Sequence, residues 1–190
     1  MVDLLSYISR YQEVLNDCLA DKKFQETVDK VYKELLKCFQ NKGTLFLLGN
    51  GGSAAEAQHM AAEYINKMHI DRLPMAAIAL CTDTSNLTSI GNDRGFEFVF
   101  SRQIEALGKA GDVLFAFSTS GQSKNVLLSI EVARVKGLIT VLFTGSQSSL
   151  TDSVADLIIP VPSEITPEIQ TIHTILGHYI AARVEKALFD

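Results

Sequence analysis

The sequence has few cysteines and no long apolar run. Its three cysteines, Cys18, Cys38 and Cys81, are odd in number and lack the C-x-x-C or Cys/His spacing of metal and redox motifs. Such cysteines are typical of a reduced, intracellular protein and exclude a disulfide scaffold. Apolar runs such as residues 45–48 stop after a few residues, far short of the length that a membrane-spanning helix needs.

Basic residues are also scarce. Seventeen Lys and Arg against 22 Asp and Glu give a formal net charge of −5, and no useful Lys/Arg cluster is visible. Because a protein that binds nucleic acid or an anionic membrane needs a basic face, we expect neither partner. The first residues lack a positive segment followed by an apolar one, so we expect no secretory signal and a cytoplasmic location.

The length of 190 residues suits one α/β domain with a sizeable core, so residues 1–190 are predicted to form a single domain. Residues 2–40 show two amphipathic helical patterns, separated by a break around Asp21, and Gly43 follows them as a helix C-terminal signal. We expect residues 1–42 to form an N-terminal helical extension that packs on the sheet or on another subunit.

Short apolar runs alternate with helical patterns after Gly43. The runs are typical of strands buried on both faces, and they span residues 44–48, 75–80, 113–117, 139–143 and 157–161. The helical patterns span residues 53–66, 84–91, 96–107, 122–136 and 166–188. This alternation predicts a doubly wound parallel sheet with right-handed crossovers. Ligands bind beyond the carboxyl ends of the strands in such a sheet.

Two loops at predicted strand ends have the composition of anion-binding loops. Residues 49–53 read G-N-G-G-S and lead into a helix, whose free N–H groups and close backbone approach suit an anion. This loop lacks the lysine of a Walker loop and the full G-x-G-x-x-G spacing, so it predicts no nucleotide cofactor. Residues 118–123 offer four hydroxyls ahead of another helix. Each loop alone could be a serine-capped turn; together they predict a phosphate site.

Several ionisable residues could perform chemistry. His59 and Glu63 are four residues apart and therefore fall on one helix face. Such a pair can ligate a metal, can supply a general base with its orienting partner, or can be an ordinary surface pair. His173 and His178 are five apart and point in different directions, so we expect core packing for one and function for the other. Residues 92–93, an Asn–Asp pair at a predicted helix end, either terminate the helix or recognise sugar hydroxyls.

Four segments resemble the phosphoheptose isomerases of the sugar isomerase (SIS) superfamily, and they read GNGGSAAEAQHMAAE, TDTSNLTSIGNDRGFEFVFSRQIEALGKAGDVL, STSGQSKNV and IQTIHTILGH. The resemblance covers nearly the whole chain in order. It implies a flavodoxin-like sheet of five parallel strands flanked by helices, and a homotetramer. It also implies aldose–ketose isomerisation of sedoheptulose 7-phosphate to D-glycero-D-manno-heptose 7-phosphate, which supplies heptose for bacterial lipopolysaccharide or capsule.

The resemblance assigns roles residue by residue. The catalytic pair corresponds to Glu63 and His178, a base and an acid that would act through an enediol. The zinc ligands, with one ion per subunit, correspond to His59, Glu63, Gln170 and His178. The substrate-binding positions correspond to Asn50, Gly51, Gly52, Ser53, Glu63, Asn92, Asp93, Ser118, Thr119, Ser120, Ser123 and Gln170.

Spacing limits how these ligands can be arranged. Gln170 and His178 are eight residues apart, which is about 12 Å along a straight helix. Either Gln170 lies in a loosened first turn, or different subunits supply different ligands; we favour active sites at subunit interfaces. Pro167 and Glu168 replace a usual Ala-Arg pair and Thr171 stands where Glu is common, which leaves the exact substrate preference open.

The same resemblance includes a rival function. A non-enzymatic SIS protein binds the bacterial replication initiator, and it lacks the acidic residue and the last-helix histidine of the catalytic pair. Because this sequence has both Glu63 and His178, we favour the isomerase over the binding protein.

Overall fold

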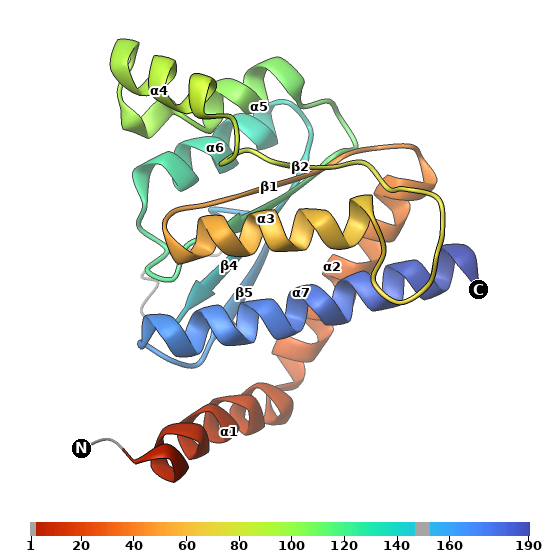
Figure 1. The fold of residues 1–190 in the computed structure, drawn as a ribbon, viewed down its shortest axis with the longest axis vertical. Helices are drawn as coiled ribbons and strands as arrows, with labels where there is room; N and C mark the ends of the chain where they lie inside the picture. The colour runs from red at the N-terminus through yellow and green to blue at the C-terminus, as the bar shows by residue number, and fades with distance from the viewer. Residues whose placement is uncertain (1–2, 147–152) are drawn as a thin grey trace.

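The computed structural model describes residues 3–146 and 153–190. A sheet of five parallel strands forms its centre, with helices on both faces (Figure 1). The strands are β1 (Leu45–Gly49), β2 (Ala77–Ala79), β3 (Val113–Phe117), β4 (Ile139–Gly145) and β5 (Leu157–Val161). Their order, β2-β1-β3-β4-β5, is that of a flavodoxin-like doubly wound sheet, which confirms the predicted fold class. The edge strand β2 is shorter than predicted because only three of its residues pair with β1.

The helices lie close to their predicted positions. They are α1 (Leu4–Ala20), α2 (Lys22–Gln40), α3 (Gly52–Ile65), α4 (Thr84–Asp93), α5 (Ser101–Leu107), α6 (Lys124–Val135) and α7 (Thr166–Phe189). Asp21 separates α1 from α2 because its carboxylate accepts hydrogen bonds from the first N–H groups of α2. The predicted helix over residues 96–107 is divided into a 3-10 turn, Phe96–Phe98, and α5.

Two hydrophobic cores lie on the two faces of the sheet. Successive residues of β1 alternate between them, so that Leu47 packs with α2, α3 and α7 while Leu48 packs with α5 and α6. Every residue of β1 and β3 is buried, as expected for central parallel strands. Within the described residues, no helix combines the length and the apolarity needed to cross a membrane.

The helices α3 and α7 lie side by side and run in the same direction (Figure 1). They approach closely because α7 carries Gly177 at the contact: a Cβ there would lie 2.3 Å from the Sδ atom of the buried Met60. Three side-chain contacts follow one another along the two helices. They join Ser53 to Gln170, Glu56 to Thr174 and His59 to His178. The two helices therefore hold polar residues from distant parts of the sequence in register.

A buried ion pair fixes the far end of this helix pair. Arg72 Nε donates to Glu185 Oε2 at 2.9 Å, and Glu185 also accepts the N–H groups of residues 68–70. Burial opposes its ionisation, but these N–H groups and Arg72 hold the pKa of Glu185 below its usual value. Arg72 in turn donates to the carbonyl oxygens of Glu63 and Tyr64 at 2.7 Å. The C-terminal end of α3 is thereby tied to α7.

Candidate active site

The two predicted anion-binding loops meet between β1 and β3, where the strand order of the sheet reverses. We call residues 49–53 the glycine loop and residues 118–123 the serine loop. Asn50 in the glycine loop and Asn125 in the first turn of α6 exchange two side-chain hydrogen bonds, each of 2.9 Å. This pair fixes the start of α6, which directly follows the serine loop, beside the glycine loop.

The serine loop presents hydroxyls and free N–H groups at the start of α6. Ser118 is buried and its Oγ donates to Ser123 Oγ at 3.3 Å, while Ser120 Oγ accepts the N–H of Gln122 at 3.2 Å. Ser123 precedes α6 without capping it through its side chain, so the first N–H groups of the helix stay available. The carbonyl of Thr119 accepts the N–H of Gly145 at 3.0 Å and anchors the loop to β4. Such an arrangement suits a phosphate group.

The glycine loop contacts α7 through its last two residues. Gly51, at φ 57°, precedes α3 without a side-chain cap, and Ser53 lies buried inside the first turn. Ser53 is therefore not the helix cap; its Oγ accepts a hydrogen bond of 3.3 Å from Gln170 Nε2. A Cβ on Gly52 would lie 2.7 Å from the same nitrogen, so a larger residue there would displace the Gln170 amide from this position.

Two histidines and a glutamate converge further along α3 and α7, and we call them the His–Glu–His cluster. His59 Nε2 lies 3.2 Å from Glu63 Oε1 and 3.4 Å from His178 Nε2. One ligand-type atom from each residue lies within 4.8 Å of the other two. Two imidazoles and a carboxylate form a common zinc donor set. Of these side chains, His59 is 51% exposed and Glu63 19%, so the cluster is open to a ligand.

The other predicted site residues lie elsewhere. The first turn of α7 is regular, since Ile169 N–H bonds to Ile165 O at 3.1 Å, so no loosened turn carries Gln170 to the cluster. Asn92 and Asp93 end α4, are exposed, and share a hydrogen bond of 2.8 Å. In the described part of the chain, no hydrogen bond or ion pair joins Gln170, Asn92 or Asp93 to the cluster, which distinguishes them from His59, Glu63 and His178.

A buried polar pair lies behind the site. His173 Nδ1 is 4.0 Å from Glu56 Oε2, and neither of these buried atoms has a hydrogen-bond partner within the described residues. Burial lowers the pKa of His173 to about 4 and raises the pKa of Glu56 to about 8. The pair is therefore two neutral groups at neutral pH and not an ion pair. His173 lies in the core against Phe117 and Phe143, whereas His178 lies in the cluster.

Three residues near the site were not predicted from the sequence: Glu56, Asn125 and Thr174. Glu56 had a usable signal, because it precedes His59 by three residues and Glu63 by seven and thus shares their helix face. Asn125 stands in the first turn of a helix after a polar loop, a position that alone suggests only capping. Thr174 had no signal, since its contact with Glu56 Oε1 at 3.4 Å depends on how α7 packs against α3.

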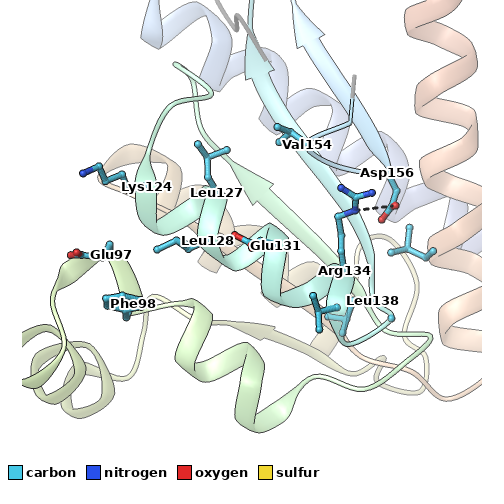
Figure 2. A pocket seen from close by; sticks show the side chains of 13 residues that line it. Glu97, Phe98, Lys124, Leu127, Leu128, Glu131, Arg134, Leu138, Val154 and Asp156 are labelled. Atoms are coloured by element: carbon cyan, nitrogen blue, oxygen red, sulfur yellow. Dashed lines mark ion pairs between the residues drawn. The ribbon is translucent and has the colours of Figure 1, made fainter. Parts of the chain in front are cut away.

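Two cavities compete as the binding site. The larger, of about 1040 Å³, lies beside α6 and is lined mainly by apolar side chains such as Leu127, Leu128 and Val154 (Figure 2). Its rim carries the Arg134–Asp156 ion pair of 3.7 Å, and no residue predicted to act on substrate lines it. A cavity of about 640 Å³ is lined by Gly52, His59 and Gln170 among others, so we place the site there.

Fold and site define a class: a doubly wound α/β protein with phosphate-type loops beside a His–Glu–His cluster. A model of the SIS domain matches residues 6–145. The phosphoheptose isomerase of Burkholderia pseudomallei (strain 1710b) is 45% identical over 182 residues, or 96% of this chain and 92% of that protein. That of Aneurinibacillus thermoaerophilus is 42% identical over 184 residues, or 97% and 93%.

Solved structures of phosphoheptose isomerases have the same fold as this chain. The phosphoheptose isomerase GmhA from Neisseria gonorrhoeae has a TM-score of 0.86 at 35% identity, with 96% of this chain and 97% of that chain covered. The phosphoheptose isomerase from Francisella tularensis has a TM-score of 0.89 at 28% identity and covers 96% of each. The chain therefore belongs to the phosphoheptose isomerase family of SIS-domain proteins.

The raised pKa of Glu56 predicts how stability depends on pH. The unfolded chain ionises this carboxyl above its usual pKa of 4.5, whereas the folded chain keeps the proton up to about 8. Unfolding therefore releases a proton between these values, and the free energy of unfolding falls as the pH rises. Glu56→Gln removes this loss, so its melting temperature should gain about 10 °C on wild type between pH 5 and pH 8.

Differential scanning calorimetry at several pH values measures this gain. Glu131→Gln, at an exposed position on α6, is the matched control and should follow wild type at every pH. A constant difference between Glu56→Gln and wild type from pH 5 to pH 8 would show that Glu56 is ionised in the folded protein.

Proposed function

We propose that this protein is a phosphoheptose isomerase that converts sedoheptulose 7-phosphate to D-glycero-D-manno-heptose 7-phosphate. The observation that carries the proposal is the convergence of His59, Glu63 and His178 on the α3–α7 pair. The glycine loop leads into α3, and the serine loop lies beside it at the start of α6. The relatives that bear this name match nearly the full length of the chain. Lipopolysaccharide and capsule are both possible destinations for the heptose.

The two loops are proposed to hold the phosphate. Ser118, Thr119, Ser120 and Ser123 supply hydroxyls and N–H groups, and the glycine loop, with Asn50, Gly51, Gly52 and Ser53, supplies a second helix N-terminus. These donors are neutral, so an anionic substrate can bind without a lysine or arginine cluster. Asn92, Asp93 and Gln170 are proposed to contact the sugar hydroxyls.

Glu63 and His178 are proposed to move the protons. Glu63 removes a proton from carbon 1 of the ketose while His178 donates one to the carbonyl oxygen at carbon 2, and an enediol forms. His178 then accepts the proton of the oxygen at carbon 1 as the aldehyde forms, and Glu63 returns its proton to carbon 2, so that both residues regain their starting states. Both residues lie within 4.8 Å of each other in one chain, which allows them to serve adjacent carbons.

A zinc ion, one per subunit, fits the His–Glu–His cluster. His59, Glu63 and His178 would hold it from one chain, and the fourth predicted ligand, Gln170, would come from a second copy because its own side chain reaches Ser53. When bound, the ion would polarise the carbonyl oxygen of the substrate. No nucleotide cofactor is proposed, since neither loop has a nucleotide-binding fingerprint.

We propose a homotetramer with active sites at the subunit interfaces. The outward face of α1 carries Leu4, Leu5, Ile8 and Leu19, which are 74%, 77%, 47% and 69% exposed. An apolar cavity of about 480 Å³ lies between α1, α2 and α7, next to this face. Apolar area of this kind is typical of a surface that a second copy covers.

Two further features complete the proposal. Residues 1–190 form one SIS domain, with residues 1–42 as an N-terminal helical extension whose second helix adds Val31 and Leu35 to the core. The cytoplasm suits the protein because its three cysteines are free thiols. The replication-initiator binder stays a rival; it is not favoured, because the curated relatives cited above are all phosphoheptose isomerases.

Turnover of sedoheptulose 7-phosphate by the purified protein tests the function directly. Glu63→Gln and His178→Gln should each lower kcat by about 10²–10⁴-fold, because each removes one proton-transfer group. Circular dichroism establishes that the variants are folded, and Glu131→Gln on α6 should retain full activity. A folded Glu63→Gln protein with full activity contradicts the assignment of Glu63 as the base. A wild-type protein that binds the replication initiator and shows no turnover contradicts the proposed isomerase activity.

Metal removal tests the zinc proposal. Elemental analysis should find about one zinc per chain, lost on dialysis against a chelator together with most of the turnover, and both should return when zinc is added. His59→Gln should lose the metal, whereas His69→Gln, at an exposed histidine outside the cluster, should keep it. Full activity in the metal-free protein would rule out a catalytic zinc.

Charges on the outer face of α1 test the assembly. Native mass spectrometry should show four chains in the wild type, and the double variant Leu4→Glu and Ile8→Glu should shift the mass toward one chain and lower turnover by at least about 10-fold. Val135→Glu changes a residue on α6 that is 85% exposed, and it should leave both unchanged. Dissociated chains with unchanged turnover would place the whole active site in one subunit.

A further inference from the structure

The first helix forms one wall of the cavity that Gly52, His59 and Gln170 line. This cavity of about 640 Å³ extends from the glycine loop at Gly52 to the cluster at His59, a step of about 10 Å along α3. Its walls come from three helices: α3 with Gly52 and His59, α7 with Gln170 and Thr174, and α1 with Tyr7 and Tyr11. A linear sugar phosphate that reaches from the glycine loop to the cluster would lie along this cavity.

Two phenol groups face this cavity as a pair. The oxygen atoms of Tyr7 and Tyr11 lie 2.7 Å apart, with the ring centroids at 5.2 Å. This hydrogen bond raises the pKa of Tyr11. One O–H is used within the pair, which leaves one O–H and several lone pairs for a ligand.

The tyrosines continue the buried face of α1 toward the N-terminus of the helix. Tyr7, Tyr11, Val14 and Cys18 follow one another at helical spacings of four, three and four, and the last two are buried against α2 and α7. Leu5 and Ile8 lie on a different face of the helix, whereas Leu4 precedes Tyr7 by three residues and Tyr11 by seven and so shares their face. Tyr7 is 48% exposed and Tyr11 is half-buried, so the phenol pair is open to a ligand in the cavity.

An ion pair holds α1 in this position. Arg10 Nε donates to Glu168 Oε1 at 2.8 Å, and Glu168, only 4% exposed, also accepts the hydroxyl of Ser163 at 2.6 Å. The hydrogen bond from Arg10 holds the pKa of Glu168 below its usual value. Because Arg10 follows Tyr7 by three residues and precedes Tyr11 by one, this contact places the phenols beside the first turn of α7. Glu168, which departs from the family pattern, thus has a structural role.

We propose that Tyr7 and Tyr11 belong to the substrate site and hydrogen-bond the middle hydroxyl groups of a linear sugar phosphate. This inference rests on the proposed function: the loops hold the phosphate, the cluster holds the reacting carbons, and the hydroxyls between them need partners. The phenols are specificity-determining residues and touch no reacting atom. They recognise the length and hydroxylation of the sugar, since a site that hydrogen-bonds a hydroxyl discriminates against a ligand that lacks it.

Steady-state kinetics of the double variant Tyr7→Phe and Tyr11→Phe test the inference in the full-length protein. KM for sedoheptulose 7-phosphate should rise about 10-fold while kcat stays within about two-fold, because the lost hydrogen bonds act equally in the ground and transition states. Tyr179→Phe removes an exposed phenol on α7 that does not line this cavity, and it should match wild type. Unchanged KM in the double variant overturns the inference.

Direct binding separates this inference from the proposed function. A seven-carbon alditol 7-phosphate has no carbonyl group and cannot be isomerised, so calorimetry measures its affinity whether or not the wild type shows turnover. The double variant should bind it about 10-fold more weakly and bind inorganic phosphate as wild type does. Equal loss for both ligands, or for neither, overturns the inference, as does a wild type that binds no alditol phosphate. Weaker alditol binding without wild-type turnover supports the inference and overturns the isomerase.

Discussion

The close parallel packing of α3 against α7 is the constraint on which the site depends. Gly177 allows the approach by leaving room for Met60, and the buried Arg72–Glu185 pair fixes its far end. Along the shared face, one contact joins the glycine loop to Gln170 and another joins His59 to His178. A shift of one helix by a single turn would break both contacts, so packing in the core sets the chemistry at the surface.

Burial and neutral donors explain how an acidic chain can accept a phosphate. The sequence has a net charge of −5 and no Lys/Arg cluster that would predict a basic binding face. The starts of α3 and α6 both lack side-chain caps and therefore keep N–H donors for a ligand. Behind them, Glu56 and His173 are held neutral by burial and add no charge near the site. The scarcity of basic residues argues against a polyanionic ligand such as nucleic acid. It does not argue against a single phosphate group, which these neutral donors can bind.

Sequence reasoning predicted most of the fold and part of the site. Five apolar runs became the five strands, because strands buried on both faces need continuous apolar residues. The His59–Glu63 contact followed from a spacing of four on one helix. The place of Gln170 could be predicted only in part. Its spacing to His178 indicated that the two residues of one chain could not hold the same ion, but only the structure showed that Gln170 contacts Ser53. The neutral state of Glu56 depends on burial by distant residues, which no local pattern reveals.

The sequence by itself determined the elements, their order and the loops at the strand ends, because periodicity, glycines and caps act between residues a few positions apart. Only the tertiary structure decided which of these elements touch. His59 and His178 are 119 positions apart, and Ser53 and Gln170 are 117 apart. Their contacts depend on the angle and register at which α3 meets α7, which arise from the fit of whole helix faces around Gly177 and Met60. Short-range spacing carries no information on that fit.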